Sequence, residues 1–148
     1  MKRLLIFVLS INLLLIFTGC DDTKATKILD FKESDVESVE LYRFNIPTEA
    51  QAMIITENED IEEIINAFDE IVIEGDATDF YVVGGEVTSF RFNLKNGGEF
   101  IVAYWEGILR NSDNINHKVT ADSIANLWDD LDYHKDSVSE EKLPIIGN

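Results

Sequence analysis

Carboxylates crowd the end of the last predicted helix, where their oxygen atoms could hold a metal ion. Asp129, Asp130, Asp132 and Asp136 lie close together in the chain, with His134 among them. Carboxylate oxygens on adjacent turns are the hard ligands that Ca²⁺ prefers. Because the end of a helix disfavours negative charge, the cluster must be either solvated or neutralised by a cation. We favour a solvated cluster, with a calcium site as the alternative and no other cofactor.

An arginine and two aromatic residues form a second candidate, which would recognise a partner rather than a metal. Tyr104 and Trp105 lie near the end of one predicted strand, and Arg91 lies on the strand before it. Trp, Tyr and Arg are enriched at the energetic centres of protein interfaces. An uncovered sheet face would present all three as a recognition patch. In the alternative interpretation, the last helix covers this face through Trp128.

Enzymatic chemistry is not expected from this sequence. Nucleophilic catalysis needs a nucleophile beside a base that a third group orients. The chain has only two histidines, His117 in a polar segment and His134 after the last helix, and it contains no G-x-S-x-G motif. These two histidines would also need two further ligands to bind zinc. We therefore predict a binding protein and not an enzyme.

The N-terminus has the pattern of a secretory signal. Lys2 and Arg3 precede an apolar run over residues 4–17, which is a short charged region followed by a hydrophobic one. A helix that spans a bilayer needs about 20 apolar residues, so this run is too short to be a spanning anchor. We expect residues 1–19 to be a cleaved signal peptide.

The only cysteine lies at the end of this run, in the sequence Phe17-Thr18-Gly19-Cys20. This segment resembles the lipobox of bacterial lipoproteins. The resemblance implies that the Cys20 thiol receives a diacylglycerol and that the chain is cleaved between Gly19 and Cys20. It also implies that acyl chains such as palmitate anchor the mature protein. Two or more acyl chains give stable membrane attachment.

A lipid on Cys20 would place the protein outside the cytoplasm, on the outer leaflet of the cytoplasmic membrane. Asp21 follows the cysteine directly. In a host with two membranes, this aspartate resembles the signal for retention on the inner membrane, and the outer membrane is the alternative location. Residues 20–34 are polar and charged, and we interpret them as a flexible tether.

The composition is strongly acidic, with 29 Asp and Glu against 12 Lys and Arg and a formal net charge of −17. Removal of residues 1–19 would take away Lys2 and Arg3, which leaves 10 basic residues against the same 29 acidic ones. Nucleic acid and anionic lipid surfaces are excluded as partners, because both are bound through basic patches. A cationic envelope or secreted protein is the suitable partner, although acidity that serves only solubility is the simpler alternative.

Apolar periodicity predicts a sheet and two helices. Residues 36–46 and 51–56 alternate as strands, and further strands are expected around residues 87–105. The apolar stripe of the first helix contains Ile61, Ile64, Ile65, Phe68 and Ile71. The stripe of the second helix contains Ala121, Ile124, Trp128 and Leu131. Residues 111–117 are predicted to be a polar loop.

A hairpin is predicted around Asn96-Gly97-Gly98, because these residues tolerate the positive φ angles of a tight turn. A three-residue loop would pair Phe92 with Val102 and would place the apolar residues of both strands on one face. A two-residue loop would instead pair Phe92 with Ala103. We favour the first register.

The order of elements, β-β-α-β-β-β-α, predicts an α+β fold. We expect an antiparallel sheet of about five strands with two helices packed mainly on one face. Residues 35–134 would form a single domain, and residues 135–148 would be a polar C-terminal tail. The stretches "VESVELY" and "DIEEIINAF" and the later "NG" turn resemble, in layout, small lipoproteins of low-GC Gram-positive bacteria that contain domains of unknown function. This resemblance implies the same location and no activity.

These features predict a lipid-anchored extracytoplasmic protein that binds a partner protein, in the manner of an inhibitor or an immunity protein. The alternative is a domain that binds a divalent cation or a small ligand. The carboxylate cluster would be the site in that case.

Overall fold

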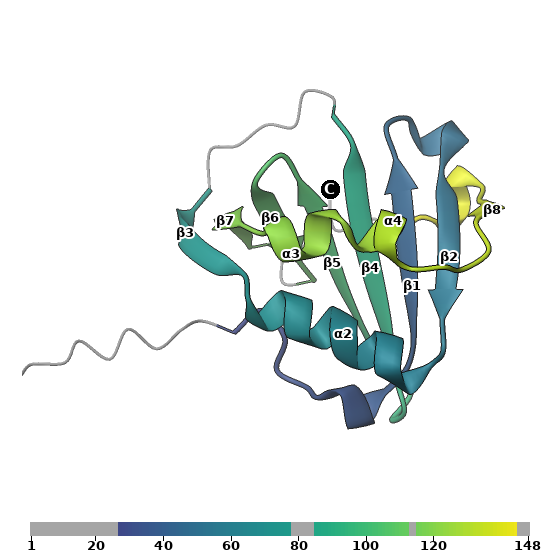
Figure 1. The fold of residues 1–148 in the computed structure, drawn as a ribbon. Helices are drawn as coiled ribbons and strands as arrows, with labels where there is room; N and C mark the ends of the chain where they lie inside the picture. The colour runs from purple at the N-terminus through teal and green to yellow at the C-terminus, as the bar shows by residue number, and fades with distance from the viewer. Residues whose placement is uncertain (1–26, 78–84, 113–114, 145–148) are drawn as a thin grey trace, which may run out of the picture.

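The computed structural model describes residues 27–77, 85–112 and 115–144, so the predicted signal peptide and Cys20 lie outside the described residues. Its centre is an eight-stranded sheet with the order β3-β7-β6-β5-β4-β1-β2-β8, in which all neighbouring strands are antiparallel (Figure 1). The strands are β1 (Val36–Phe44), β2 (Gln51–Ile55), β3 (Val72–Asp76), β4 (Val87–Leu94), β5 (Glu99–Trp105), β6 (Ile108–Asn111), β7 (Asn116–Thr120) and β8 (Asp136–Ser137).

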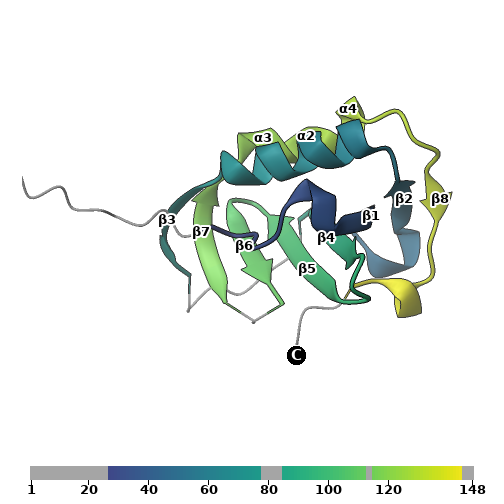
Figure 2. The same ribbon diagram turned by 90° about the horizontal axis from the view of Figure 1, so that it is seen from below.

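Helices accompany the sheet and confirm the predicted α+β class. The described α-helices are α2 (Asn58–Asp69), α3 (Asp122–Ala125) and α4 (Leu127–Asp130), and the 3₁₀ helices are η1 (Glu33–Asp35), η2 (Pro47–Glu49) and η3 (Glu140–Lys142). Figure 2 shows α2, α3 and α4 above the sheet in that view, whereas η3 lies near its lower edge. The three α-helices contribute buried side chains to one core cluster together with the sheet.

The predicted number of about five strands is wrong, because the sheet has eight. The strands outside the predicted ranges are short: β3 has five residues, β6 has four, β7 has five and β8 has two. Part of the predicted loop over residues 111–117 belongs to β6 and β7. These strands contain polar residues without clear apolar alternation, so their pairing depends on neighbouring strands rather than on a local pattern.

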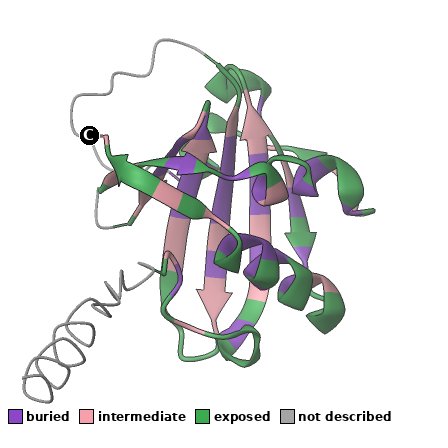
Figure 3. Cartoon of the chain, turned by 60° about the vertical axis from the view of Figure 1, so that its left-hand side comes forward, coloured by how far each residue is buried: buried purple, intermediate pink, exposed green. Residues whose placement is uncertain are grey.

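The apolar face of α2 packs on the sheet, as its residue spacing predicts. Ile61, Ile64 and Phe68 are buried in the core. The Phe68 ring meets Phe90 and Phe92 of β4 edge to face, with centroid distances of 4.9 and 5.5 Å, a favourable aromatic geometry. Figure 3 shows buried bands on the central strands, whereas α2 also exposes a green outer surface. Alternate residues of each strand point into this core, and the residues between them point to the opposite face of the sheet. We call this opposite face the outer face.

The second predicted helix is interrupted. It consists of the four-residue helices α3 and α4, which join at Asn126. Ile124, Leu127 and Trp128 are nevertheless buried in the same core cluster as α2. Trp128 therefore packs in the core and does not cover the outer face, so this alternative from the sequence is wrong.

Both predicted registers of the β4–β5 hairpin are wrong. Phe92 pairs with Phe100, and the Leu94 and Gly97 amides donate to the carbonyl oxygens of Gly98 and Leu94, both at 2.8 Å. The loop has three residues, as favoured, but it begins one residue earlier than predicted. Gly97 adopts φ +85°, a conformation that glycine adopts without the steric cost of a Cβ atom. The apolar residues of the two strands still share one face, because the register differs by an even number of residues.

The domain is longer at both ends than predicted. Leu29 is only 3% exposed, and the Phe31 ring lies 5.3 Å from the Phe92 ring, measured between centroids. Leu29 and Phe31 therefore belong to the domain, although the sequence pattern placed them in the predicted tether over residues 20–34. In the predicted tail, β8 pairs with β2, and Leu143 is buried against Tyr42. Isolated apolar residues in polar segments are a weak signal, since burial depends on a surface that the rest of the fold supplies.

Candidate functional site

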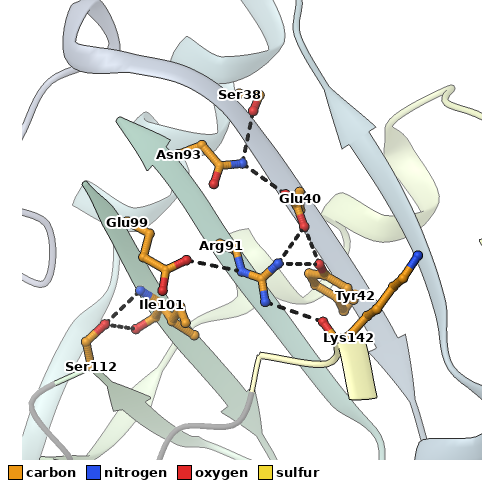
Figure 4. Close-up of polar contacts among 9 residues, drawn as sticks. All are labelled: Ser38, Glu40, Tyr42, Arg91, Asn93, Glu99, Ile101, Ser112 and Lys142. Carbon is orange, nitrogen blue, oxygen red and sulfur yellow. Dashed lines mark hydrogen bonds and ion pairs between the residues drawn. The ribbon is translucent and has the colours of Figure 1, made fainter. Parts of the chain in front are cut away.

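Four polar side chains converge on the outer face from the paired strands β1 and β4. Glu40 lies opposite Arg91 in the register, and Tyr42 and Asn93 lie two residues further along their strands. The period of two in a strand places these residues on the face opposite Val39, Leu41 and Phe92. Figure 4 shows the side chains directed toward Glu40. We call these four residues the outer-face network.

Hydrogen bonds join the network around the Glu40 carboxylate. Arg91 Nη1 donates to Glu40 Oε2 at 2.9 Å and to Tyr42 Oη at 3.0 Å. Asn93 Nδ2 donates to Glu40 Oε1 at 3.0 Å, and the Tyr42 hydroxyl also donates to Glu40. Arg91 lies over the Tyr42 ring, 5.5 Å from its centroid. Each carboxylate oxygen of Glu40 therefore accepts at least one hydrogen bond.

The electrostatics of the network fix its protonation states. Burial acts to raise the pKa of Glu40, but the hydrogen bonds from Tyr42 and Asn93 and the charge of Arg91 outweigh it, and the pKa is lowered. Burial and the neighbouring Glu40 carboxylate raise the pKa of Tyr42. A general acid or base works best with a pKa near the operating pH. Both shifts lead away from neutral pH, so the network is suited to holding structure and binding groups, not to proton transfer.

A groove of about 430 Å³ lies beside the network. Its lining includes Glu40, Tyr42 and Arg91, the β2 residues Ala52 and Ile54, and a wall formed by the C-terminal residues 136–139, 141 and 142. Arg91 Nη2 donates to the carbonyl oxygen of Lys142 at 3.3 Å, which attaches this wall to the sheet. Charges of both signs line the groove.

A second groove, of about 440 Å³, lies between α2 and the pair α3–α4 and is lined by acidic residues. Its five carboxylates belong to Glu59, Glu62, Glu63, Glu70 and Asp130. None of its lining residues is Lys, Arg or His. Glu59, Glu62 and Glu63 lie on the exposed side of α2, because the apolar stripe of this helix faces the core, and Glu70 directly follows the helix. We call this region the acidic groove.

The predicted recognition patch does not form. Tyr104 faces the core side of β5, where it packs against the main cluster, and Trp105 faces the outer side, where it is 6% exposed beside Ala103 and Ile108. Arg91 belongs to the outer-face network. Adjacent residues in a strand point to opposite faces, so the sequence itself contained the signal that separates Tyr104 from Trp105.

The predicted carboxylate cluster is dispersed in the described residues. Asp129 Oδ2 accepts a hydrogen bond from Arg43 Nη1 at 3.0 Å, Asp130 lines the acidic groove, and Asp136 Oδ1 lies 3.1 Å from His134 Nε2. Within residues 27–77, 85–112 and 115–144, no group of three or more His, Cys, Asp or Glu side chains is arranged to hold a metal ion. Calcium binding through Asp132 and its neighbours stays an untested prediction.

Sequence reasoning missed the outer-face network. Glu40 and Arg91 are 51 residues apart in the chain, and no local pattern indicates that β1 and β4 are neighbours. The sequence did contain one indication of the network: alternation places Glu40 and Tyr42 on one face of their strand, opposite its apolar residues. It places Arg91 and Asn93 in the same way on the other strand. A polar set of this kind indicates a face that is not the main core.

Comparison of the chain with models of protein families, with curated proteins and with solved structures finds no match in any of the three. Among the described helices, none has the length and hydropathy needed to cross a membrane. The fold and the site geometry described above define an acidic α+β domain. It has a polar network on one face of its sheet and an acidic groove along α2.

Proposed function

We propose that this chain is a lipid-anchored extracytoplasmic protein whose domain binds a cationic partner protein, as an inhibitor or an immunity protein would. The observation that supports this proposal best is the acidic groove, which has five carboxylates and no cation in its lining. Complementary charge steers association and selects partners. In this proposal α2, α3 and α4 form one layer on the sheet, and the partner meets the outward surface of that layer.

Several carboxylates without a partner lie together on the exposed side of α2. Glu59, Glu62 and Glu63 make no ion pair or side-chain hydrogen bond within the described part of the chain, whereas Glu40, Glu74 and Glu86 are paired with basic residues. Unpaired charges of one sign along a helix produce a negative potential that a basic surface can neutralise. A cationic partner would therefore meet several unpaired carboxylates together at α2.

The proposed anchor would hold this surface near the membrane. Six residues separate Cys20 from Lys27, the first described residue, and an extended chain covers about 3.5 Å per residue. The domain would thus lie within about 25 Å of the lipid. A partner at the envelope or one that approaches it from outside would be within reach.

The proposal is tested with the chain from residue 20 onward, in which Cys20→Ser replaces the lipid-bearing residue. This protein is the bait for envelope and secreted proteins at about 150 mM salt. At this salt concentration, interactions between exposed charges more than about 8 Å apart are screened. We expect a basic protein to be retained in stoichiometric amount. Its affinity for the purified bait is then measured by calorimetry. Retention of basic proteins only at low salt would show that the acidity serves solubility.

Two double variants with the same change in net charge locate the surface. Glu62→Gln with Glu63→Gln should weaken binding by about tenfold, since each removed contact charge is worth roughly 0.7 kcal/mol. Glu140→Gln with Glu141→Gln, in η3 beside the other groove, should change affinity less than about twofold. The reverse order would place the partner on the outer face instead.

A further inference from the structure

The turn between β4 and β5 contains the only Asn-Gly pair of the chain, Asn96-Gly97. Both residues are exposed, and neither is paired in the ladder between the two strands. An asparagine followed by glycine can react without an enzyme, because the backbone nitrogen of the glycine attacks the carboxamide carbon of the asparagine. Glycine has no Cβ atom to obstruct this approach. The geometry of the turn decides whether the two groups meet.

The Asn96 side chain folds back along the backbone that follows it. Its Oδ1 accepts a hydrogen bond from the Gly98 amide at 2.8 Å. This bond closes a small ring that contains both Cγ of Asn96 and the nitrogen of Gly97, so it holds the carboxamide near the atom that would attack it. The Gly98 amide would also stabilise the negative charge that develops on Oδ1 during the attack.

The surroundings of Gly97 leave its nitrogen room to move. A Cβ atom added at Gly97 would meet no atom within 4 Å. The Gly97 amide donates to the carbonyl oxygen of Leu94 at 2.8 Å, and this bond must open before the nitrogen can react. It lies at the exposed tip of a hairpin, where backbone hydrogen bonds open at low cost in free energy.

Asn93, near the end of β4, has the opposite arrangement. Its Nδ2 donates to Ser38 Oγ at 3.1 Å and to Glu40 Oε1 at 3.0 Å. These bonds direct the carboxamide toward the neighbouring strand and away from its own backbone. The next residue is Leu94, whose side chain crowds the amide nitrogen. Asn93 is therefore held in the outer-face network and provides an internal reference for Asn96.

We propose that Asn96 is a site of spontaneous deamidation in the folded protein. The Gly97 nitrogen bonds to Cγ of Asn96, the bond from Cγ to Nδ2 breaks, and the proton of the Gly97 amide leaves with Nδ2 as ammonia. Water then opens the resulting cyclic imide at either carbonyl, which gives aspartate or isoaspartate. Overall, one asparagine and one water yield one acidic residue and one ammonia. The inference is independent of the proposed cationic partner and of the lipid anchor.

The product would alter the end of the hairpin. Either product adds a negative charge, and isoaspartate also adds one atom to the backbone of the turn. Lys95 attaches this turn to η1, since its amide donates to the Asp35 carbonyl and its Nζ to the Ser34 carbonyl, both at 2.8 Å. We therefore expect the isoaspartate fraction to show faster hydrogen exchange at the Leu94 and Lys95 amides than the unreacted protein.

Peptide mapping by mass spectrometry tests the proposal on the chain from residue 20 onward with Cys20→Ser, kept folded at mildly alkaline pH. A synthetic peptide of residues 93–99 is the unfolded reference. We expect Asn96 to convert before any other asparagine, about 3–10-fold more slowly than in the peptide, since one hydrogen bond of the Gly97 amide must open. In H₂¹⁸O, the heavy oxygen should enter the product. Earlier conversion of another asparagine, or conversion of Asn96 more than about 100-fold slower than in the peptide, would overturn the proposal.

Two matched variants assign the reaction to its residue. Asn96→Gln lengthens the side chain by one methylene and should abolish the mass change in this part of the map. Asn93→Gln makes the same change in the outer-face network and should leave the conversion of Asn96 unaltered. An unchanged mass gain in Asn96→Gln would place the reaction at a different residue and would contradict the proposal.

Discussion

Arg91 is the residue with the most contacts in the outer-face network. It donates hydrogen bonds to Glu40, to Tyr42 and to the Lys142 carbonyl, and it lies over the Tyr42 ring. The Arg91 and Glu40 side chains are 22% and 24% exposed, so their interaction is only partly screened. Removal of one partner leaves the other charge half-buried without compensation.

We expect Arg91→Met to lower the free energy of unfolding by about 1–3 kcal/mol at pH 7, because Glu40 then loses its cationic partner. The folded pKa of Glu40 lies below its ordinary value of 4.5. A carboxylate with a lowered folded pKa stabilises the protein above its unfolded pKa, and this contribution disappears as the pH falls through the folded pKa. The difference between wild type and variant should therefore shrink toward pH 3. Urea denaturation at both pH values measures it.

The double variant Glu40→Gln, Arg91→Met is the control for that experiment. It removes both charges, so its stability should depend less on pH between 3 and 7 than that of Arg91→Met. A loss of the same size at pH 3 and pH 7 would show that Arg91 stabilises the protein through packing alone.

At the scale of elements, the first described segment behaves as part of the core and not as a tether. Leu29 is buried in the main cluster, and Phe31 packs edge to face on Phe92 and Phe100. The periodicity of residues 20–34 shows none of this, because single apolar residues in a polar segment have no period. Their burial depends on the sheet surface that β4 and β5 present.

Leu29→Ala tests this segment. Truncation of a fully buried leucine removes its transfer free energy and leaves a cavity, so we expect a loss of about 2–4 kcal/mol in the free energy of unfolding. Ile54→Ala is the matched control, since Ile54 is 60% exposed and its truncation should cost less than about 1 kcal/mol. Similar small losses in both variants would mean that residues 27–31 are detached in solution.

The β4–β5 hairpin and the last helix show which features of an element its residue pattern predicts and which it does not. Alternation assigned Phe90, Phe92 and Val102 to one face, and the structure agrees. The partner of each residue depended on where the turn begins, and two adjacent glycines allow more than one start. The last helix has a continuous apolar stripe in the sequence, yet it forms two pieces that meet at Asn126, so its continuity was not determined by the stripe.

At the scale of the whole molecule, the proposed lipid on Cys20 would decide where the acidic domain acts. The attachment that the sequence predicts is a lipid on Cys20, which lies outside the described residues. Full-length protein expressed in a bacterium should fractionate with membranes, and Cys20→Ala should move it to the soluble fraction. Mass spectrometry of the mature N-terminus gives the second readout.

Thr18→Ala is the control for the anchor, because it keeps a small residue before the cysteine and should leave the protein in the membrane fraction. A wild-type chain found in the soluble fraction without a lipid on Cys20 would contradict the anchor. The cationic-partner proposal could still hold in that case, since the acidic groove belongs to the domain.

The sequence by itself determined what depends on neighbouring residues: the apolar face of α2, the two faces of β1 and β4, the α+β class and the acidic composition. These follow from periods of 3.6 and 2 residues and from simple counting. Tertiary structure alone decided that Glu40 meets Arg91 and that Leu29 and Leu143 are buried. Such contacts join residues far apart in the chain, and their free energy exists only after the strands between them have paired, so no local pattern records them.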